Sequence, residues 1–201
     1  MPDSFRYIVA AFDFDGTITR RDSMLAFIRF VRGDLVFWGG MCVLLPVLIP
    51  FKLKLISEKR AKEIMLTFFL GGMHSQTLWE KGAQFADEKI PAIVRPAALA
   101  RIRWHQAEGH MCFLVTASLT FWVRAWAEKE GFILIATKPE ISGGIFTGKI
   151  SGANCKGMEK VHRLEEILAG TSPSKKYAYG DTSGDKPMLQ WADEGFYRHF
   201  S

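Results

Sequence analysis

The fold is indicated most strongly by one stretch near the N-terminus, Tyr7-Ile8-Val9-Ala10-Ala11-Phe12-Asp13-Phe14-Asp15-Gly16-Thr17. It opens with a continuous apolar run, which is typical of a central strand of a parallel sheet, buried on both faces. Two carboxylates separated by a single residue, Asp13 and Asp15, follow this run directly. Because side chains alternate along a strand, Asp13 and Asp15 should point alike while Phe14 packs the other way. Open α/β sheets bind ligands at the carboxyl ends of their strands, so this acidic pair predicts a site there.

The turn after this strand suits metal and phosphate chemistry. Gly16 permits a positive φ or a close backbone approach, and Thr17 adds a hydroxyl. Paired carboxylates suit Mg²⁺, which takes oxygen ligands and is usually shared with a substrate phosphate. One carboxylate can then attack phosphorus while its neighbour transfers the proton. A solvated turn is the simpler explanation of an isolated Asp-x-Asp pair, so partners must come from elsewhere in the chain.

Length and composition indicate one domain with an ample core, since the chain has 201 residues of which 48% are apolar. The net charge of +5 fits an anionic substrate or an anionic membrane surface. No Lys/Arg block stands out, so we expect no nucleic-acid partner. Cys42, Cys112 and Cys155 lie far apart, which favours a reducing compartment over a disulfide framework or a zinc site. The polar N-terminus shows no secretory signal, so we expect a cytoplasmic protein, peripheral to the inner face of the membrane if it binds lipid.

Residues 20–95 carry helical patterns and no strand pattern. Helices are expected from Asp22 or Ser23 to Gly33, from Ser57 to Leu70, and from Ser75 to just before Pro91. We therefore expect a helical cap domain at 20–95, inserted into a core domain made of residues 1–19 and 96–201.

The segment from Leu35 to Phe51 contains no charged residue but does contain two prolines, Pro46 and Pro50. Three structures fit it: a buried helical hairpin, an element that dips into a membrane surface, or a short transmembrane helix. A basic cluster next to it favours a surface of anionic lipid. That cluster consists of Lys52, Lys54, Lys59, Arg60 and Lys62. For lipid contact at the acyl boundary we expect Phe37, Trp38, Leu44 and Leu48.

Helices and strands alternate from Pro96 to the end of the chain. The expected elements are a helix 96–108, a strand 111–115, a helix 120–130, a strand 132–136, a hairpin 141–150, a helix after Gly157, a strand 177–179, a helix from Pro187 and a last strand 195–197. This order predicts an α/β fold with a parallel sheet and right-handed crossovers.

Chemistry-bearing residues follow several of these strands. Thr116, Ala117 and Ser118 come after the second strand, and Asp181 and Asp185 come after the fourth. Because the carboxyl ends of parallel strands share one edge, we expect these residues to meet Asp13 and Asp15 there. A hydroxyl and backbone N–H groups can hold a phosphoryl oxygen, and a lysine can offset the charge. A third carboxylate would complete an oxygen-ligand site for Mg²⁺.

The string from Asp13 to Thr17 resembles the first motif of the haloacid dehalogenase (HAD) superfamily, most of whose members are Mg²⁺-dependent phosphatases that form an aspartyl-phosphate. The order of the later motifs resembles subclass I of that superfamily, the branch similar to phosphoserine phosphatases. Its helical cap is inserted after the first motif, as residues 20–95 are here. The resemblance implies a HAD-like Rossmannoid parallel sheet core with an inserted all-helical (C1-type) cap.

The same resemblance implies roles for individual residues. Asp13 matches the nucleophile, and Asp15 the general acid/base whose backbone carbonyl also binds metal. Thr116 matches the second-motif hydroxyl, Asp181 the metal carboxylate, and Asp185 a carboxylate that supports the metal through water. The implied metal set is thus Asp13, Asp15, Asp181 and Asp185 with Mg²⁺, and the expected substrate contacts are Gly16, Thr17, Ala117 and Ser118.

The third-motif lysine has two candidates. Lys156 matches the spacing in phosphoserine phosphatases, whereas Lys160 matches a related branch with a Gly-x-Glu-Lys pattern. We favour Lys160 because it falls in the first turn of a helix that points back toward the sheet edge. Two departures from phosphoserine phosphatases are Gly184, where those enzymes have asparagine, and Thr116-Ala117-Ser118, which replaces Ser-Gly-Gly.

The substrate has more than one candidate. The long uncharged segment resembles bacterial phosphatidylglycerophosphatases of the same branch, which implies an amphiphilic or lipid phosphate such as phosphatidylglycerophosphate. Phosphoserine or another small metabolite is the alternative. A phospho-accepting signalling module also gathers acidic residues, Thr and Lys at one sheet edge, but a helical insert has no role there. A catalytically idle membrane adaptor would have little reason to keep all four motifs.

Overall fold

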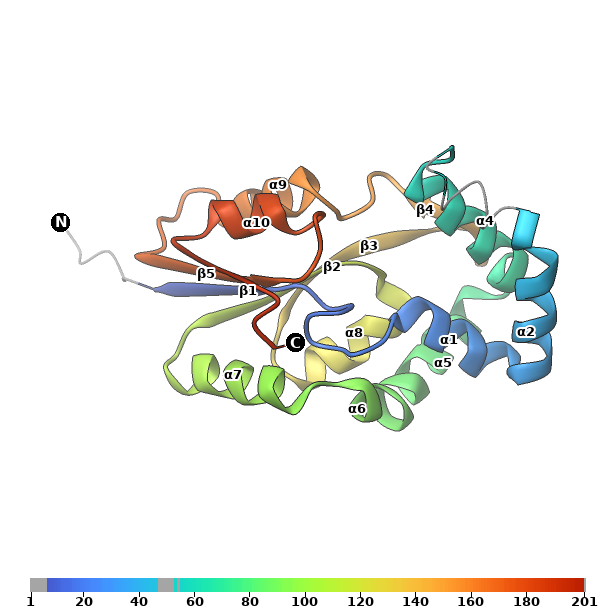
Figure 1. The fold of residues 1–201 in the computed structure, drawn as a ribbon, viewed down its shortest axis with the longest axis horizontal. Helices are drawn as coiled ribbons and strands as arrows, with labels where there is room; N and C mark the ends of the chain where they lie inside the picture. Colours follow the sequence, from blue (N-terminus) through green and yellow to red (C-terminus); the bar gives the residue numbers. More distant parts are fainter. Residues whose placement is uncertain (1–6, 47–52, 54, 201) are drawn as a thin grey trace.

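A computed structural model describes residues 7–46, 53 and 55–200 of the chain, and a six-stranded sheet forms its centre (Figure 1). The strands are β1 (Ile8–Phe12), β2 (Met111–Leu119), β3 (Ile133–Ser142), β4 (Ile145–Ser151), β5 (Lys175–Gly180) and β6 (Glu194–Tyr197), in the order β4-β3-β2-β1-β5-β6. Only the β3–β4 pair is antiparallel among these strands. The predicted α/β class is confirmed, with β1 among the central strands.

Alternating residues of β1 belong to two separate cores. Val9 and Ala11 pack with α9 (Met158–Ile167) and α10 (Lys186–Trp191). Ala10 and Phe12 pack with α7 (Pro96–Ala107) and α8 (Thr120–Lys129). Figure 1 shows these two pairs of helices on opposite faces of the sheet. Because both faces are covered, β1 is apolar at every position rather than at every second one.

The helices between β1 and α7 are α1 (Ser23–Arg32), α2 (Asp34–Val43), α4 (Glu58–Leu70), α5 (Ser75–Glu88) and α6 (Ile90–Ile93). α1, α4 and α5 start and end close to where the sequence predicts, whereas α6 contains Pro91, before which a helix was predicted to stop. The Asp22 carboxylate accepts a hydrogen bond from the Leu25 N–H at 3.0 Å, and Ser57 Oγ accepts one from the Arg60 N–H at 3.2 Å. Side chains at the N-cap thus satisfy amide groups that the helix itself leaves free.

These helices pack against the sheet layer. α4 contacts β4, and α5 contacts α8. A Cβ at Gly82 of α5 would come within 1.7 Å of the Phe121 carbonyl oxygen, so this close approach requires glycine. In Figure 1, α1, α2, α4 and α5 gather beyond one end of the sheet. The division into a core (1–19 and 96–201) and a cap (20–95) stays a prediction.

Strand β2 continues past its predicted end at Val115. Its pairing with β3 shifts between Thr116 and Leu119, and the Ser118 N–H bonds to Thr116 Oγ1 at 3.0 Å. Thr116, Ala117 and Ser118 therefore lie in an irregular part of the strand, because a side-chain acceptor replaces a ladder partner. Strand β3 is also longer than predicted and forms the first arm of the hairpin.

Burial contradicts two of the predicted lipid contacts in and next to α2, and the others stay a prediction. Phe37 and Leu44 are wrong: both are 5% exposed and belong to the core. Seven residues apart, they lie on the same face of the helix, and Phe37 stacks on Phe69 of α4 at 5.9 Å. Trp38 is 58% exposed and Leu35 is 91% exposed.

The rest of the uncharged segment is described only in part. Leu48, Pro50, Phe51, Lys52 and Lys54 lie outside the described residues. Across the ranges that the structure does describe, no helix has both the length and the apolar character needed to cross a membrane.

Candidate active site

The carboxyl end of β1 places Asp13 beside a buried lysine. The Asp13 N–H donates to the Tyr179 carbonyl of β5 at 2.9 Å, which fixes the backbone there. Lys160, in the first turn of α9, donates from Nζ to Asp13 Oδ1 at 2.6 Å and to Asp185 Oδ1 at 2.7 Å. Its side chain is 1% exposed. A buried ammonium is tolerated here because two carboxylates bind it.

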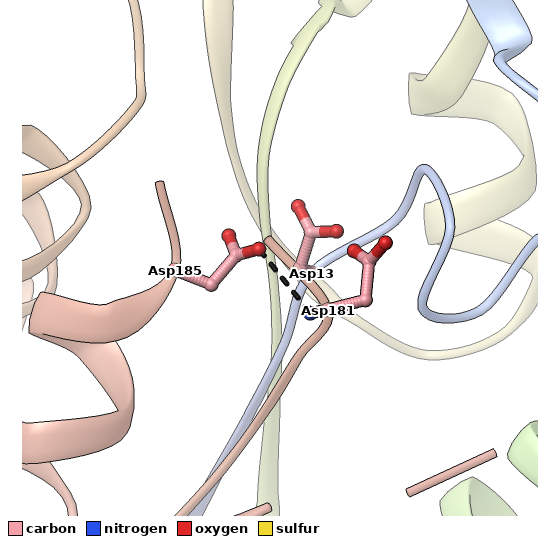
Figure 2. Close-up of side chains that lie close together, drawn as sticks. All are labelled: Asp13, Asp181 and Asp185. Carbon is pink, nitrogen blue, oxygen red and sulfur yellow. Dashed lines mark hydrogen bonds between the residues drawn. The ribbon is translucent and has the colours of Figure 1, made fainter. Parts of the chain in front are cut away.

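Three carboxylates meet at this point (Figure 2). Asp13 follows β1, Asp181 follows β5, and Asp185 precedes α10; their oxygens lie within 4.8 Å of one another. Thr17 Oγ1 lies 3.1 Å from both Asp13 Oδ2 and Asp181 Oδ1. Gly16 has φ 87°, and a Cβ there would lie 2.2 Å from Asp181 Oδ2. Glycine is therefore needed at that position both for its backbone angle and for space.

Asp185 is oriented by the loop that precedes it. Its Oδ2 accepts hydrogen bonds from the Thr182 N–H at 2.9 Å and the Thr182 hydroxyl at 2.7 Å. The Asp181 N–H also donates to it at 3.3 Å, the dashed line in Figure 2. With Oδ1 held by Lys160, both oxygens of Asp185 are engaged.

Burial and charge shift the acidities of this cluster. Burial raises the pKa of Asp13 to about 7, against the opposing charge of Lys160. Burial also raises the pKa of Asp181. For Asp185, burial acts to raise the pKa, but the charge of Lys160 and the hydrogen bonds from Lys160 and Thr182 together outweigh it, so the pKa is lowered. Burial alone would lower the pKa of Lys160, but Asp13 and Asp185 raise it, so the lysine stays charged.

The residues present fit a divalent cation. One ammonium faces three carboxylates, so two negative charges remain to be balanced, and the donors are all oxygen atoms, as Mg²⁺ prefers. Asp13, Asp181 and Asp185 would hold the ion. The Asp15 carboxylate lies outside this group, so a metal contact from Asp15 rests on its backbone carbonyl, as the family resemblance implies.

The Asp15 side chain is held by a chain of hydrogen bonds. Ser118 Oγ donates to Asp15 Oδ2 at 2.5 Å, and the Ser23 N–H donates to Oδ1 at 2.6 Å. Trp122 Nε1 donates to Ser23 Oγ at 2.9 Å, and the two serine hydroxyls are 2.9 Å apart. Since indole only donates and a carboxylate only accepts, Ser23 donates to Ser118. Burial raises the pKa of Asp15 to about 6, near the range of a general acid/base.

A cavity of about 360 Å³ opens over these groups. Thr116, Ala117 and Ser118 line it together with Asp13 and Asp185. Lys62 of α4 reaches into it, donating to the Ala117 carbonyl and, at 3.4 Å, to Asn154 Oδ1. Burial lowers the pKa of Lys62 to about 8. We predicted Lys62 as part of a basic membrane-facing cluster, and that was wrong, because the side chain points into the cavity.

The two candidate lysines of the third motif occupy different places. Lys160 contacts Asp13, whereas Lys156 forms an ion pair with Glu58 at the mouth of the cavity. Gly184 packs against the Lys156 side chain, where a Cβ would come within 2.4 Å of it.

Sequence reasoning missed several groups of this site. The sequence did not predict Ser23, Trp122, Asn154 or Thr182 as site residues, and it predicted Lys62 as a surface charge. A serine at the first position of the helix after the acidic motif was a usable signal for Ser23. Nothing local marked Trp122 or Asn154, because their roles depend on contacts between distant elements.

Comparison with known proteins places this site in context. A family model described as haloacid dehalogenase-like hydrolase matches residues 10–190. The protein CicA of Caulobacter vibrioides is 37% identical over 196 residues, which cover 96% of this chain and 86% of that protein.

Solved structures share the fold. A protein of unknown function from Bordetella pertussis Tohama I is 27% identical, with a TM-score of 0.81, covering 93% of this chain and 87% of the other. A phosphoserine phosphatase solved as a phospho-aspartyl intermediate analogue is 18% identical, with a TM-score of 0.66, covering 96% and 85%. Because the phosphoserine phosphatase is only 18% identical, its similarity to this chain shows a shared fold and nothing more.

Proposed function

The chain belongs to the haloacid dehalogenase-like hydrolases, and from this premise we propose that it is a Mg²⁺-dependent phosphatase that acts through an aspartyl-phosphate at Asp13. One observation carries the proposal: Lys160 bridges Asp13 and Asp185 while Asp181 lies within 4.8 Å of both carboxylates. Bound Mg²⁺ would supply positive charge to offset that of the nucleophile and the phosphate.

The proposed reaction has two steps. Asp13 attacks phosphorus, the bond from phosphorus to the ester oxygen breaks, and Asp15 gives its proton to the leaving alcohol. Asp15 then takes a proton from water as the water attacks the aspartyl-phosphate, which releases phosphate and restores Asp13. Ser118 and Ser23 hold Asp15 in position for both transfers.

Groups around the phosphate position have separate tasks. Thr116 Oγ1 accepts the Ser118 N–H, which leaves its own proton for a phosphoryl oxygen. The backbone at Ala117 and the turn at Gly16 and Thr17 are the further substrate contacts we propose. The Lys160 ammonium offsets the negative charge that Asp13 and the phosphoryl group bring together.

We propose an amphiphilic or lipid phosphate, such as phosphatidylglycerophosphate, as the substrate. Met24, Ala61 and Met65 give the catalytic cavity an apolar wall beside Lys62, which suits a leaving group with both polar and apolar parts. Exposed apolar side chains of α2, among them Leu35 and Trp38, support peripheral binding to an anionic membrane surface.

A small zwitterionic phosphate such as phosphoserine is the second candidate. Asp22 and Lys62 both line the catalytic cavity and carry opposite charges. Such a pair suits an ammonium and a carboxylate on one leaving group.

Phosphate release across a substrate panel tests these proposals. The panel contains phosphoserine, small sugar phosphates and phosphatidylglycerophosphate, each with Mg²⁺ and with excess chelator. We expect release only with Mg²⁺, and fastest from the lipid phosphate. Full activity in chelator would contradict the metal requirement. Faster release from phosphoserine would favour the second candidate, and the Asp13→Asn variant controls for contaminating phosphatases.

A further inference from the structure

A second cavity, of about 610 Å³, lies among α1, α2 and the α5–α6 junction. Its walls are mainly apolar, formed by Leu25, Phe30, Phe37, Trp38, Phe85 and Ile93. The volume is larger than that of the catalytic cavity and falls within the usual range for small-molecule sites, about 300–1,000 Å³. The two cavities share only Asp22 among their lining residues. It is therefore a site separate from the one that carries the proposed reaction.

The shape of this cavity is maintained by residues of the core. Phe85 is fully buried, and its ring packs edge-on against Phe27 at 5.4 Å. Phe37 is held against Phe69 by stacking. Because these rings are fixed from behind, the wall cannot easily collapse to fill the space. Water gains few hydrogen bonds from such a wall, so an apolar occupant is favoured.

The rim of the cavity is charged, and two of its cations have no acidic partner in the part of the chain that the structure describes. Arg29 is paired with Asp34, at 2.5 Å and 2.8 Å, and the Asp22 carboxylate caps α1. Among the described residues, Arg21 and Lys89 form no salt bridge. Lys89 Nζ lies 5.7 Å from the centroid of the Phe30 ring, directly beside the apolar wall. Positive charge therefore stands next to an apolar space.

We propose that this cavity binds a long-chain fatty acid, with the alkyl chain along the apolar wall and the carboxylate at Arg21 and Lys89. An alkyl chain matches the wall because it needs no hydrogen-bond partners. The carboxylate matches the rim because both cations lie beside the apolar wall, and neither is paired with an acidic side chain of residues 7–46, 53 or 55–200. The site does not depend on the proposed phosphatase activity and stands if that activity fails.

The first experiment uses fluorescence quenching by laurate that carries bromine at the chain end, below its micelle concentration. The chain has six tryptophans, of which Trp38 lines this cavity. We expect saturable quenching of the wild type and loss of that quenching in Trp38→Phe. Quenching that persists in Trp38→Phe, or that never saturates, would overturn the proposal.

Calorimetric titration with unlabelled laurate tests the two halves of the site. Affinity should rise about two- to fourfold for each added CH₂ until the cavity is full. Ala26→Phe, which fills the cavity from α1, should weaken binding at least about tenfold. Lys89→Gln should weaken it about five- to tenfold through the loss of charge. Lys89 is exposed, so this variant tests the site even if Ala26→Phe does not fold.

Two controls separate the cavity from other modes of binding. Leu35 is exposed on α2 and does not line the cavity, so Leu35→Ser should bind laurate like the wild type. A chain-matched alkyl maltoside, which has no charge, should bind at least about tenfold more weakly. Equal binding of the maltoside would overturn the carboxylate assignment. Loss of laurate binding in Leu35→Ser would show that the ligand lies on the outer face of α2 instead.

Discussion

The carboxyl edge of the sheet and the outer face of α2 depart from the usual distribution of side chains in opposite directions. At the sheet edge, Lys160 and Asp185 are charged and almost fully buried, at 1% and 2% exposed. On α2, Leu35 and Val43 are apolar and 91% and 64% exposed. Charged groups are rarely buried without partners, and large apolar groups gain free energy when they leave water.

The two regions differ in where their partners are. The buried charged groups are hydrogen-bonded within the chain: Lys160 donates to Asp13 and Asp185, and the Thr182 N–H donates to Asp185. Within the described residues, no other part of the chain covers the exposed apolar side chains Leu35 and Val43 of α2. We infer that the edge is preorganised within the chain, whereas the α2 face is suited to a surface outside it.

Replacement of Asp13, the proposed nucleophile, is expected to have the largest effect of these tests. Asp13→Asn keeps the shape of the side chain but removes its negative charge, so kcat should fall by at least about 10³-fold. Lys160 retains Asp185 as a partner, so the fold should persist. Phosphate release measures the first effect and circular dichroism the second. Near-normal turnover would exclude covalent catalysis at Asp13.

The two lysines near the site give a matched pair of variants. Lys160→Met leaves two buried carboxylates without their cation, so we expect a loss of activity of about 10²-fold or more and of about 3 kcal/mol in unfolding free energy. Lys156→Met breaks only a partly exposed pair with Glu58, worth about 1 kcal/mol or less. Denaturant unfolding and steady-state kinetics compare them. If Lys156→Met has the greater effect on turnover, the assignment of Lys160 is wrong.

The α2 face can be tested by placing charge on it. Leu35→Asp with Val43→Asp should reduce sedimentation with anionic vesicles about tenfold, because two apolar contacts become acidic. Ile167→Asp is the control, since Ile167 is also apolar and 50% exposed but lies on α9. The activity of all three proteins on a soluble substrate should be similar. Equal loss in the control would remove any special role of α2.

A smaller effect, on stability, is expected from His105, a buried histidine that stays neutral in the folded protein. Arg101 Nε donates to the Tyr179 hydroxyl at 2.7 Å, and that hydroxyl lies 2.9 Å from Nε2 of His105, a fully buried side chain. The remaining ring nitrogen of His105 faces His110 Nδ1 at 2.7 Å. Burial, followed by the charges of Arg101 and His110, lowers the pKa of His105 to about 3.

This lowered pKa makes stability depend on pH in a definite direction. Between about pH 6.5 and pH 3 the unfolded chain binds a proton at His105 that the folded protein does not, so the contribution to stability is complete above pH 6.5 and lost as the pH falls. Between pH 7 and pH 5 the wild type should lose about 1–2 kcal/mol more than His105→Gln. Urea unfolding at both pH values measures the difference, and identical losses would contradict a neutral His105.

The sequence predicted the fold well because its strongest signals were local. The apolar run before Asp13, the glycine at the end of α1 and the serine that caps α4 each act within a few residues. The exact end of β2 was missed because the bond from the Ser118 N–H to Thr116 Oγ1 extends the strand through an irregular stretch. Propensity alone does not encode such a bond.

The candidate site was predictable where motif residues follow strands and not where helices cross over it. Asp13, Asp181 and Asp185 were expected to meet because parallel strands share an edge. Lys62 was missed because its direction depends on how α4 packs, and a lysine on an exposed helix face has the same local sequence. The choice between Lys156 and Lys160 depends on tertiary contacts for the same reason, and Lys160 stays the prediction.

The central claim is that Asp13 becomes phosphorylated during turnover. The most direct measurement is mass spectrometry of the Asp15→Asn variant, acid-quenched during reaction with substrate and Mg²⁺, because slowed hydrolysis should let the intermediate accumulate. We expect the mass of one phosphoryl group on the peptide that contains Asp13, and none on the Asp13→Asn protein. An enzyme that turns over while neither the wild type nor Asp15→Asn ever carries phosphate at Asp13 would contradict the account.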